Sequence, residues 1–202
     1  STILTLCIAR HPATRIRSFY DERTLSFLAL GVAKSNNNAV GIVTTSGSAV
    51  ANLLPAFVEA SQSRYCLVAI TADRPPEKHG VGSNQTMPQI GIFSHYVTAT
   101  CALGCPSAAT LPTVSQRIRQ LMQTGQQNRQ PVHINAMFRN LEFDSRVSPY
   151  TNAQSVQLDP VVKLPDQSLD QYPDNWPHNF SMVFVGQLRS VADALVIKAY
   201  LD

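Results

Sequence analysis

The sequence has 202 residues, enough for one large or two small domains with a sizeable buried core. Its 44% hydrophobic and 14% charged residues are typical of a soluble globular protein. The net charge of +3, without a block of lysine or arginine, fits small anionic substrates better than nucleic acid, and no apolar run reaches the ~20 residues that span a bilayer.

Short runs rich in β-branched residues alternate with helical patterns along the first two thirds of the chain. We expect strands at residues 16–20, 40–45, 65–71, 96–102 and 132–135, and helices at 22–35, 48–61 and 111–124. Apolar strands with helices in most of the gaps are typical of a mostly parallel sheet flanked by helices on both faces. The predicted fold class is therefore α/β, with ligands bound at the carboxyl ends of the strands.

The helix expected at 22–35 begins with acidic residues directly after a predicted strand. Leu25, Leu28 and Val32 have the i, i+3, i+7 spacing of a buried helix face. Asp21 is a natural N-cap, and Glu22 falls in the first turn, where the helix dipole favours a negative charge. In a second interpretation Glu22 is half-buried at the strand's carboxyl end, with a pKa raised enough to share a proton with a ligand. Capping is the commoner use of such a pair, and the residues alone leave both interpretations open.

A serine and glycine turn, Ser46-Gly47-Ser48, follows the strand expected at 40–45. Gly47 permits a tight turn that directs free backbone N–H groups towards a ligand. An ordinary turn with a serine cap explains the pattern equally well. The segment is not G-x-S-x-G, which argues against a nucleophile elbow.

The segment at 70–93 places polar residues between a buried strand and a glycine-punctuated loop. Asp73 and Arg74 end the strand, two prolines stiffen the exit, and Asn84 and Gln85 follow. Arg74 could bind a carboxylate or phosphate bidentately. A solvated arginine is the alternative, and spacing alone favours it.

The cysteines and His133 have structural interpretations. Four cysteines suit a reduced compartment. Cys101 and Cys105 form C-x3-C without a second pair or a histidine doublet, so core or loop positions are favoured over a metal site. His133, inside an alternating strand, is more typical of a core histidine than of a base.

Residues 141–178 are rich in Pro, Asp, Gln and Asn, and we interpret them as an interdomain linker. One domain is expected at 1–140 and the start of a second α/β domain at 179–202. The chain begins without methionine and stops within a predicted helix, so we expect a piece of a longer polypeptide.

Five segments together resemble the pyrimidine-binding domain of thiamine-diphosphate enzymes: YDERTLSFLALGVAK, VTTSGSAVANLLPAFVEAS, ITADRPPE, GVGSNQTMPQIGIF and PVHINAMFR. More narrowly, they are similar to the 2-succinyl-5-enolpyruvyl-6-hydroxy-3-cyclohexene-1-carboxylate synthases of menaquinone and phylloquinone biosynthesis. T-A-D-R-P-P-E followed by N-Q is distinctive of that family. The resemblance covers roughly residues 1–140.

The resemblance implies thiamine diphosphate and Mg²⁺ as cofactors, with the metal ligands outside this chain. Glu22 would hydrogen-bond the aminopyrimidine ring and promote removal of the thiazolium C2 proton. Ser46 and Gly47 would line the pyrimidine side of the pocket, and Arg74 and Gln85 would face the substrates. The implied reaction decarboxylates 2-oxoglutarate and adds the succinyl carbanion to isochorismate.

The resemblance also implies a homodimer or tetramer in the bacterial cytoplasm or the plastid stroma. Ala136, Met137 and Ser83 depart from the family's pattern, which bears on local substrate contacts. One alternative is a thiamine-diphosphate carboligase of the acetolactate synthase type, which would use pyruvate and ignore isochorismate. A second is a non-catalytic truncated remnant or assembly module.

Overall fold

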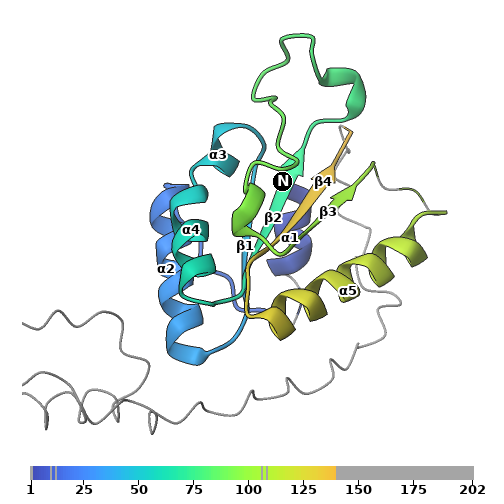
Figure 1. The fold of residues 1–202 in the computed structure, drawn as a ribbon. Helices are drawn as coiled ribbons and strands as arrows, with labels where there is room; N and C mark the ends of the chain where they lie inside the picture. Colours follow the sequence, from blue (N-terminus) through green and yellow to red (C-terminus); the bar gives the residue numbers. More distant parts are fainter. Residues whose placement is uncertain (1, 10, 12, 106, 108, 140–202) are drawn as a thin grey trace, which may run out of the picture. The chain divides into compact units, whose positions relative to one another are not determined.

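The computed structural model describes residues 2–9, 11, 13–105, 107 and 109–139. The expected linker at 141–178 and second domain at 179–202 lie outside these residues. The described part contains a four-stranded sheet made of β1 (Val40–Thr44), β2 (Leu67–Asp73), β3 (Ala99–Leu103) and β4 (Val132–Met137). The strand order is β1-β2-β4-β3 and every pair is parallel (Figure 1). The predicted α/β fold with a parallel sheet is confirmed.

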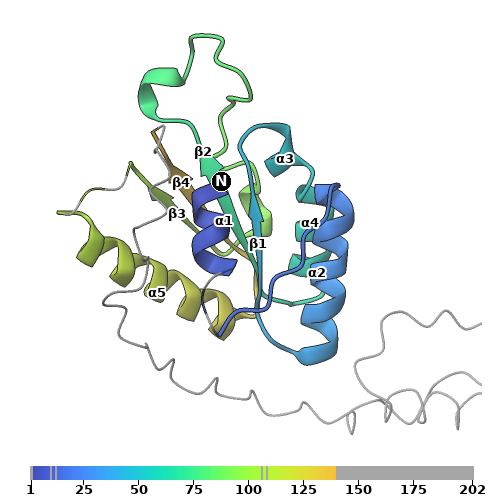
Figure 2. The same cartoon turned by 180° about the vertical axis from the view of Figure 1, so that it is seen from behind.

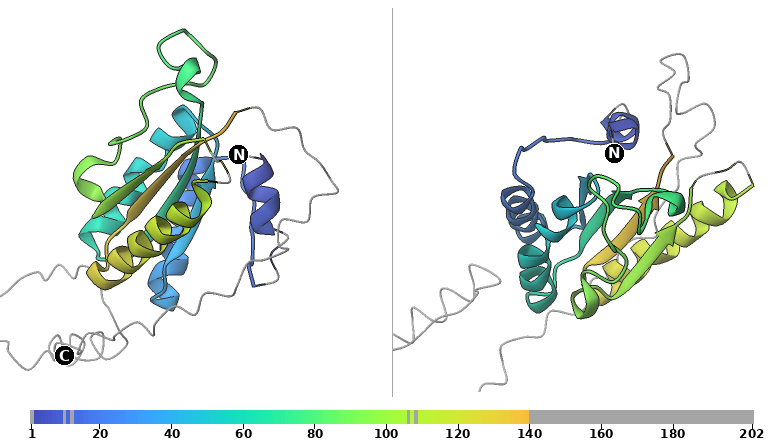
Figure 3. Two further views of the ribbon diagram at one scale, coloured as in Figure 1. Left: turned by 90° about the vertical axis from the view of Figure 1, so that its right-hand side faces the viewer. Right: turned by 90° about the horizontal axis from the view of Figure 1, so that it is seen from above.

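Helices cover both faces of the sheet (Figure 3). On one face α2 (Glu22–Asn36) and α4 (Leu54–Gln62) enclose a core centred on Phe57, Leu53 and Phe93. On the other face α5 (Leu111–Asn128) packs through Leu121 onto β3 and β4. No helix of the described part is long and apolar enough to cross a membrane.

The beginning of the chain differs from the prediction. Residues Thr2–Ala9 form a helix, α1, where no element was expected, and the predicted strand at 16–20 is absent. Residues 14–19 have no regular structure, as Figure 2 shows for the segment leading into α2, and Ile16 is 44% exposed. A strand needs a neighbour for its backbone hydrogen bonds, and β1 pairs only with β2 in the described sheet.

The buried face of α2 is also not the predicted one. Leu28 and Val32 are exposed and Leu25 is half-buried. The face that packs on the core consists of smaller residues together with one leucine: Ser26, Ala29, Leu30 and Ala33. Small side chains let α2 approach the sheet closely. The larger apolar residues Leu28 and Val32 form an apolar stripe on its outer side.

The helix predicted at 48–61 is divided into α3 (Ser48–Ala51) and α4, with a turn at Asn52 and Leu53. Pro55 explains the division, because it has no N–H to donate to the carbonyl of Ala51, four residues earlier. The other helices and the strands agree with the prediction apart from their ends. The largest shift is in α5, which continues to Asn128 instead of ending at 124, and β3 begins at Ala99 because Ser94–Tyr96 forms a short 3-10 helix, η2.

Candidate functional site

The polar motifs of the sequence gather beyond the carboxyl ends of the strands. The turn from β1 into α3 contains residues 45–47, and the long loop after β2 contains residues 74–93. Figure 1 shows this loop and α3 at the same end of the sheet. β4 ends there as well, with Phe138 N–H donating to the carbonyl oxygen of Asp73 at 3.0 Å.

Asp21 and Glu22 have different surroundings at the start of α2. Asp21 caps α2, because its Oδ1 accepts a hydrogen bond from the N–H of Thr24 at 2.6 Å, and this bond holds the pKa of Asp21 below its usual value. The half-buried Glu22 does not follow a strand, so that part of the prediction is wrong. Instead α2 brings Glu22 to the turn beyond α3, where Asn52 Nδ2 donates to Glu22 Oε2 at 3.3 Å.

The turn at Ser46 and Gly47 is bound tightly to the loop at 85–89. Ser46 is buried, and its Oγ donates to the carbonyl oxygen of Gln85 at 2.8 Å. Gly47 has φ +76°, a left-handed conformation that favours glycine, and its N–H donates to Gln89 Oε1 at 2.8 Å. A Cβ built on Gly47 would lie 2.8 Å from Gln85 Cγ. The expectation of a free N–H at Gly47 is therefore wrong, since the protein uses it internally.

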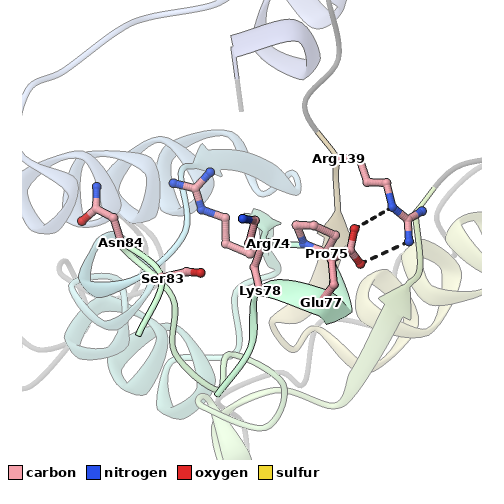
Figure 4. A pocket seen from close by; sticks show the side chains of 7 residues that line it. All are labelled: Arg74, Pro75, Glu77, Lys78, Ser83, Asn84 and Arg139. Carbon is pink, nitrogen blue, oxygen red and sulfur yellow. Dashed lines mark hydrogen bonds and ion pairs between the residues drawn. The ribbon is translucent and has the colours of Figure 1, made fainter. Parts of the chain in front are cut away.

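Arg74 lies at one side of a pocket of about 510 Å³. The pocket is lined by Arg74, Pro75, Glu77, Lys78, Ser83, Asn84 and Arg139. Glu77 Oε1 accepts from Arg139 Nε at 2.8 Å, whereas Arg74 Nε is buried and has no partner in the described residues. Figure 4 shows the Arg74 guanidinium on the side of Ser83 and Asn84, apart from the paired Arg139. The pocket thus offers unpaired positive charge to an anion.

Gln85 does not line this pocket, although a substrate role was predicted for both Gln85 and Arg74. Gln85 packs on Ser46 and Gly47, and Asn84 takes the place beside Arg74. Asn84, Lys78 and the buried Gln89 were not among the predicted site residues. The only signal in the sequence for Gln89 is a polar residue inside the apolar segment MPQIGIF.

His133 is a core residue, as predicted. Its ring is fully buried, stands edge-on to Phe93 with 4.8 Å between centroids, and places Nε2 2.8 Å from Thr71 Oγ1. Burial lowers the pKa of His133 to about 4, so the ring is neutral near pH 7. His79 places Nε2 3.5 Å from Asp73 Oδ1 and 3.1 Å from the carbonyl oxygen of Arg74.

Cys101 and Cys105 occupy a core and a loop position, as predicted. Cys101 is buried in β3, and Cys105 is half-buried in the loop that follows. Burial raises the pKa of another core cysteine, Cys66, to about 11. Across the described ranges no group of three His, Cys, Asp or Glu side chains is placed to hold a metal ion.

Comparison with known proteins assigns the family. Residues 2–93 match the model of the thiamine pyrophosphate enzymes' N-terminal TPP binding domain. The chain is 45% identical over 152 residues to a 2-succinyl-5-enolpyruvyl-6-hydroxy-3-cyclohexene-1-carboxylate synthase of Vibrio parahaemolyticus, covering 74% of the chain and 27% of that protein. The part of the chain at residues 2–93 belongs to the thiamine pyrophosphate enzymes.

Two further relatives carry the same synthase name. The chain is 44% identical over 140 residues to the protein of Chloroflexus aurantiacus, covering 69% of the chain and 24% of that protein. It is 34% identical over 215 residues to that of Actinobacillus pleuropneumoniae, covering 100% of the chain and 38% of that protein. The chain thus spans about a quarter to two fifths of the length of these relatives.

The residues of this thiamine pyrophosphate enzyme domain fit the aminopyrimidine half of the cofactor. Glu22 offers a half-buried carboxylate. Thr44, at the carboxyl end of β1, has a buried Oγ1 without a hydrogen-bond partner in the described residues. A buried hydroxyl without a partner is costly, and a ring that carries both donors and acceptors could satisfy it.

Proposed function

We propose that the polypeptide carrying this chain is a thiamine-diphosphate-dependent transferase. It would decarboxylate 2-oxoglutarate and join the remaining succinyl unit to isochorismate, giving 2-succinyl-5-enolpyruvyl-6-hydroxy-3-cyclohexene-1-carboxylate in menaquinone or phylloquinone biosynthesis. The observation that carries the proposal is the half-buried Glu22 at the start of α2, in a chain whose relatives are named as this synthase. The relatives are bacterial, which favours the bacterial cytoplasm over the plastid stroma as its compartment.

Glu22 would act on the aminopyrimidine ring. Thiamine diphosphate, when bound, supplies the carbon nucleophile that a 2-oxo acid needs in order to lose carbon dioxide. Glu22 would hold and return a proton at a ring nitrogen, a task for a carboxyl group that is only partly exposed to water. Asn52 would orient the carboxylate, because its Nδ2 already donates to Glu22 Oε2. The Thr44 hydroxyl would face the same ring.

The pocket beside Arg74 would bind the carboxylates of the substrates. Arg74 has an unpartnered Nε, and Lys78 adds a second positive charge to the same pocket. Asn84 contributes an amide that can donate to a carboxylate oxygen. Gln85, Ser46 and Gly47 would form the wall between this pocket and the cofactor.

The diphosphate and its Mg²⁺ would be held by another part of the polypeptide. The relatives are about three times as long as the chain, since 152 aligned residues are 27% of one and 140 are 24% of another, which leaves room for such a domain. We further propose a homo-oligomer, supported by the exposed apolar side chains Phe27, Leu28 and Val32 on α2, the helix that begins with Glu22.

The test is Glu22→Gln in the full-length enzyme, assayed with isochorismate, 2-oxoglutarate, thiamine diphosphate and Mg²⁺. Loss of the proton-transferring carboxylate is expected to lower kcat by about 100-fold or more. Asp21→Asn is the matched control, because asparagine still caps α2 and only the charge is lost. A folded Glu22→Gln enzyme with wild-type activity would show that Glu22 is an acidic residue of the first turn of α2 without a catalytic role.

Two competing functions give other results in the same assay. A carboligase of the acetolactate synthase type would consume pyruvate and be indifferent to isochorismate. A non-catalytic module would fold and turn over neither substrate.

A further inference from the structure

Gln89 is a buried side chain at this end of the sheet whose amide oxygen and amide nitrogen both have hydrogen-bond partners. It is 1% exposed, and its Oε1 accepts from Gly47 N–H at 2.8 Å. Its Nε2 donates to the carbonyl oxygen of Ala72 at 3.1 Å and to Asn135 Oδ1 at 2.8 Å. A primary amide has two N–H donors, and both have partners here. Gln89 therefore joins the turn at Gly47 to two neighbouring strands, β2 and β4.

The hydrogen bonds run in one donor-to-acceptor direction from Gly47 to Asp73, and Arg74 donates to Asp73 from the other side. The backbone N–H of Gly47 can only donate, so the oxygen of Gln89 faces Gly47 and its nitrogen faces Asn135. The oxygen of Asn135 therefore accepts, and its Nδ2 donates to Asp73 Oδ2 at 2.8 Å. Asp73 Oδ1 in turn accepts from the backbone N–H of Arg74 at 2.7 Å.

A branch into the sheet anchors this chain of bonds. Thr71 Oγ1 lies 2.8 Å from both Asn135 Oδ1 and His133 Nε2. A hydroxyl has one proton, so if Thr71 donates to Asn135 it must accept from His133 Nε2–H. This assignment leaves His133 Nδ1 as a bare acceptor, in agreement with its lack of a partner in the described residues. Asn135 is thus held by three side chains: Gln89, Thr71 and Asp73.

We propose that Gln89 and Asn135 are positioning residues of the enzyme. With Asp73 they form a buried relay that fixes the turn at Ser46 and Gly47 relative to the loop that begins at Arg74. The catalytic meaning of this inference rests on the proposed function. There the relay sets the distance between the turn at Ser46 and Gly47, which faces the cofactor, and the pocket beside Arg74, which binds the substrate carboxylates. Neither Gln89 nor Asn135 lines that pocket itself.

The relay is tested by the backbone amide signals of Gly47 and Arg74 in ¹H–¹⁵N spectra of the full chain. Gln89→Leu is expected to shift both signals and to speed hydrogen exchange at Gly47. Asn135→Leu is expected to shift both as well, although Asn135 bonds to neither amide. Because the residues act in series, the double variant should shift the signals little more than either single variant.

Gln130→Leu is the control for the loss of a hydrogen-bonded amide, and Gln130 is half-buried. Gln130 makes two hydrogen bonds to Ser61, one from Ser61 Oγ at 2.9 Å and one to its carbonyl oxygen at 3.0 Å, and it precedes β4 at the opposite end of the strand. It should leave Gly47 and Arg74 unmoved. If it shifts them as much as Gln89→Leu does, or if Gln89→Leu leaves Arg74 in place, the relay is refuted.

Gln89→Glu provides a milder variant in case the leucine variants do not fold. A carboxylate still accepts from Gly47 N–H but cannot donate to Asn135. The expected result is a shifted Arg74 signal with Gly47 nearly unchanged, and the reverse pattern would refute the relay.

Thiamine diphosphate affinity of the full-length enzyme gives a second readout. Misplacement of the turn by Gln89→Leu is expected to weaken binding by about tenfold, the effect of one buried amide group left unpaired. Unchanged affinity in Gln89→Leu would refute the positioning role. Failure of the wild-type enzyme to bind the cofactor would refute the proposed function, whereas the amide signals would still decide whether the relay exists.

Discussion

The buried His133 makes the stability of the domain depend on pH. Its pKa is about 4 in the folded chain against an ordinary value of 6.5, because burial disfavours the charged ring. Between these values the unfolded chain binds a proton that the folded chain does not. The free energy of unfolding should therefore fall as pH falls from 6.5 to about 4, by an amount on the order of 3 kcal/mol from this group.

Urea denaturation at pH 7 and pH 4.5 measures this effect. Carboxylates such as Glu59 also lose stabilising bonds in acid, since the hydrogen bonds from Ser63 and Lys34 lower its pKa. The comparison with His133→Gln removes their contribution, and this variant should lose less stability between the two pH values than wild type. The exposed His95, changed to Gln, serves as the control and should follow wild type. Equal losses in all three proteins would contradict the assignment.

Arg74 should govern substrate affinity. Its buried Nε has no partner in the described residues, so a substrate carboxylate would form a new charge-assisted bond there. Arg74→Met in the full-length enzyme is expected to raise the KM for an anionic substrate by about tenfold to 100-fold, which corresponds to ~1.5–3 kcal/mol. Steady-state kinetics measure the change, with Arg119→Met on the exposed side of α5 as control. An unchanged KM would show that Arg74 does not bind the substrate carboxylate.

At the scale of elements, two helical glycines have opposite surroundings. A Cβ on Gly31 of α2 would meet nothing within 4 Å. A Cβ on Gly125 of α5 would lie 2.7 Å from Val132 Cγ1 and 3.1 Å from Cys66 Sγ. Gly125 therefore lets α5 pack closely against the strands below it.

Alanine at these two glycines should give effects of opposite sign. Gly31→Ala is expected to stabilise the domain by about 0.5–1 kcal/mol, because alanine loses less backbone entropy in a helix. Gly125→Ala is expected to destabilise it by about 1–2 kcal/mol, because overpacking outweighs the same helix preference. Shifts of both denaturation midpoints in the same direction would show that α5 can move away from the sheet.

The elements also show what the sequence could predict. The strands β1, β2 and β4 are apolar along most of their length, so both faces of the sheet must be covered. This hydrophobic pattern alone therefore predicts a parallel sheet. The expected strand at 16–20 shows the limit, because strand formation depends on a neighbour that local sequence does not reveal. In the same way the motif predicts Glu22 as a site residue, whereas its partner Asn52 and the contact of Gln89 with Gly47, 42 residues apart, depend on the tertiary fold.

At the scale of the whole molecule, the outer side of α2 presents exposed apolar side chains that the proposed oligomer would cover. Phe27, Leu28 and Val32 are 42%, 40% and 39% exposed, on the helix that begins at Glu22. In the described part about two fifths of each side chain faces solvent, and burying that remainder would stabilise a complex by about 0.6–1.2 kcal/mol for each. We therefore expect the proposed oligomer to bury this stripe, which places its interface beside the proposed cofactor site.

The double variant Phe27→Ser, Leu28→Ser in the full-length enzyme tests this expectation. Loss of two buried apolar side chains should raise the dissociation constant of the oligomer by about tenfold or more, since each tenfold corresponds to 1.4 kcal/mol. Sedimentation velocity over a range of protein concentrations measures the shift towards smaller species. Leu111→Ser is the control, because Leu111 is 56% exposed at the start of α5, away from α2. If the double variant and the control sediment like wild type, α2 is not at the interface, and Glu22 would have to work without a neighbouring subunit beside it.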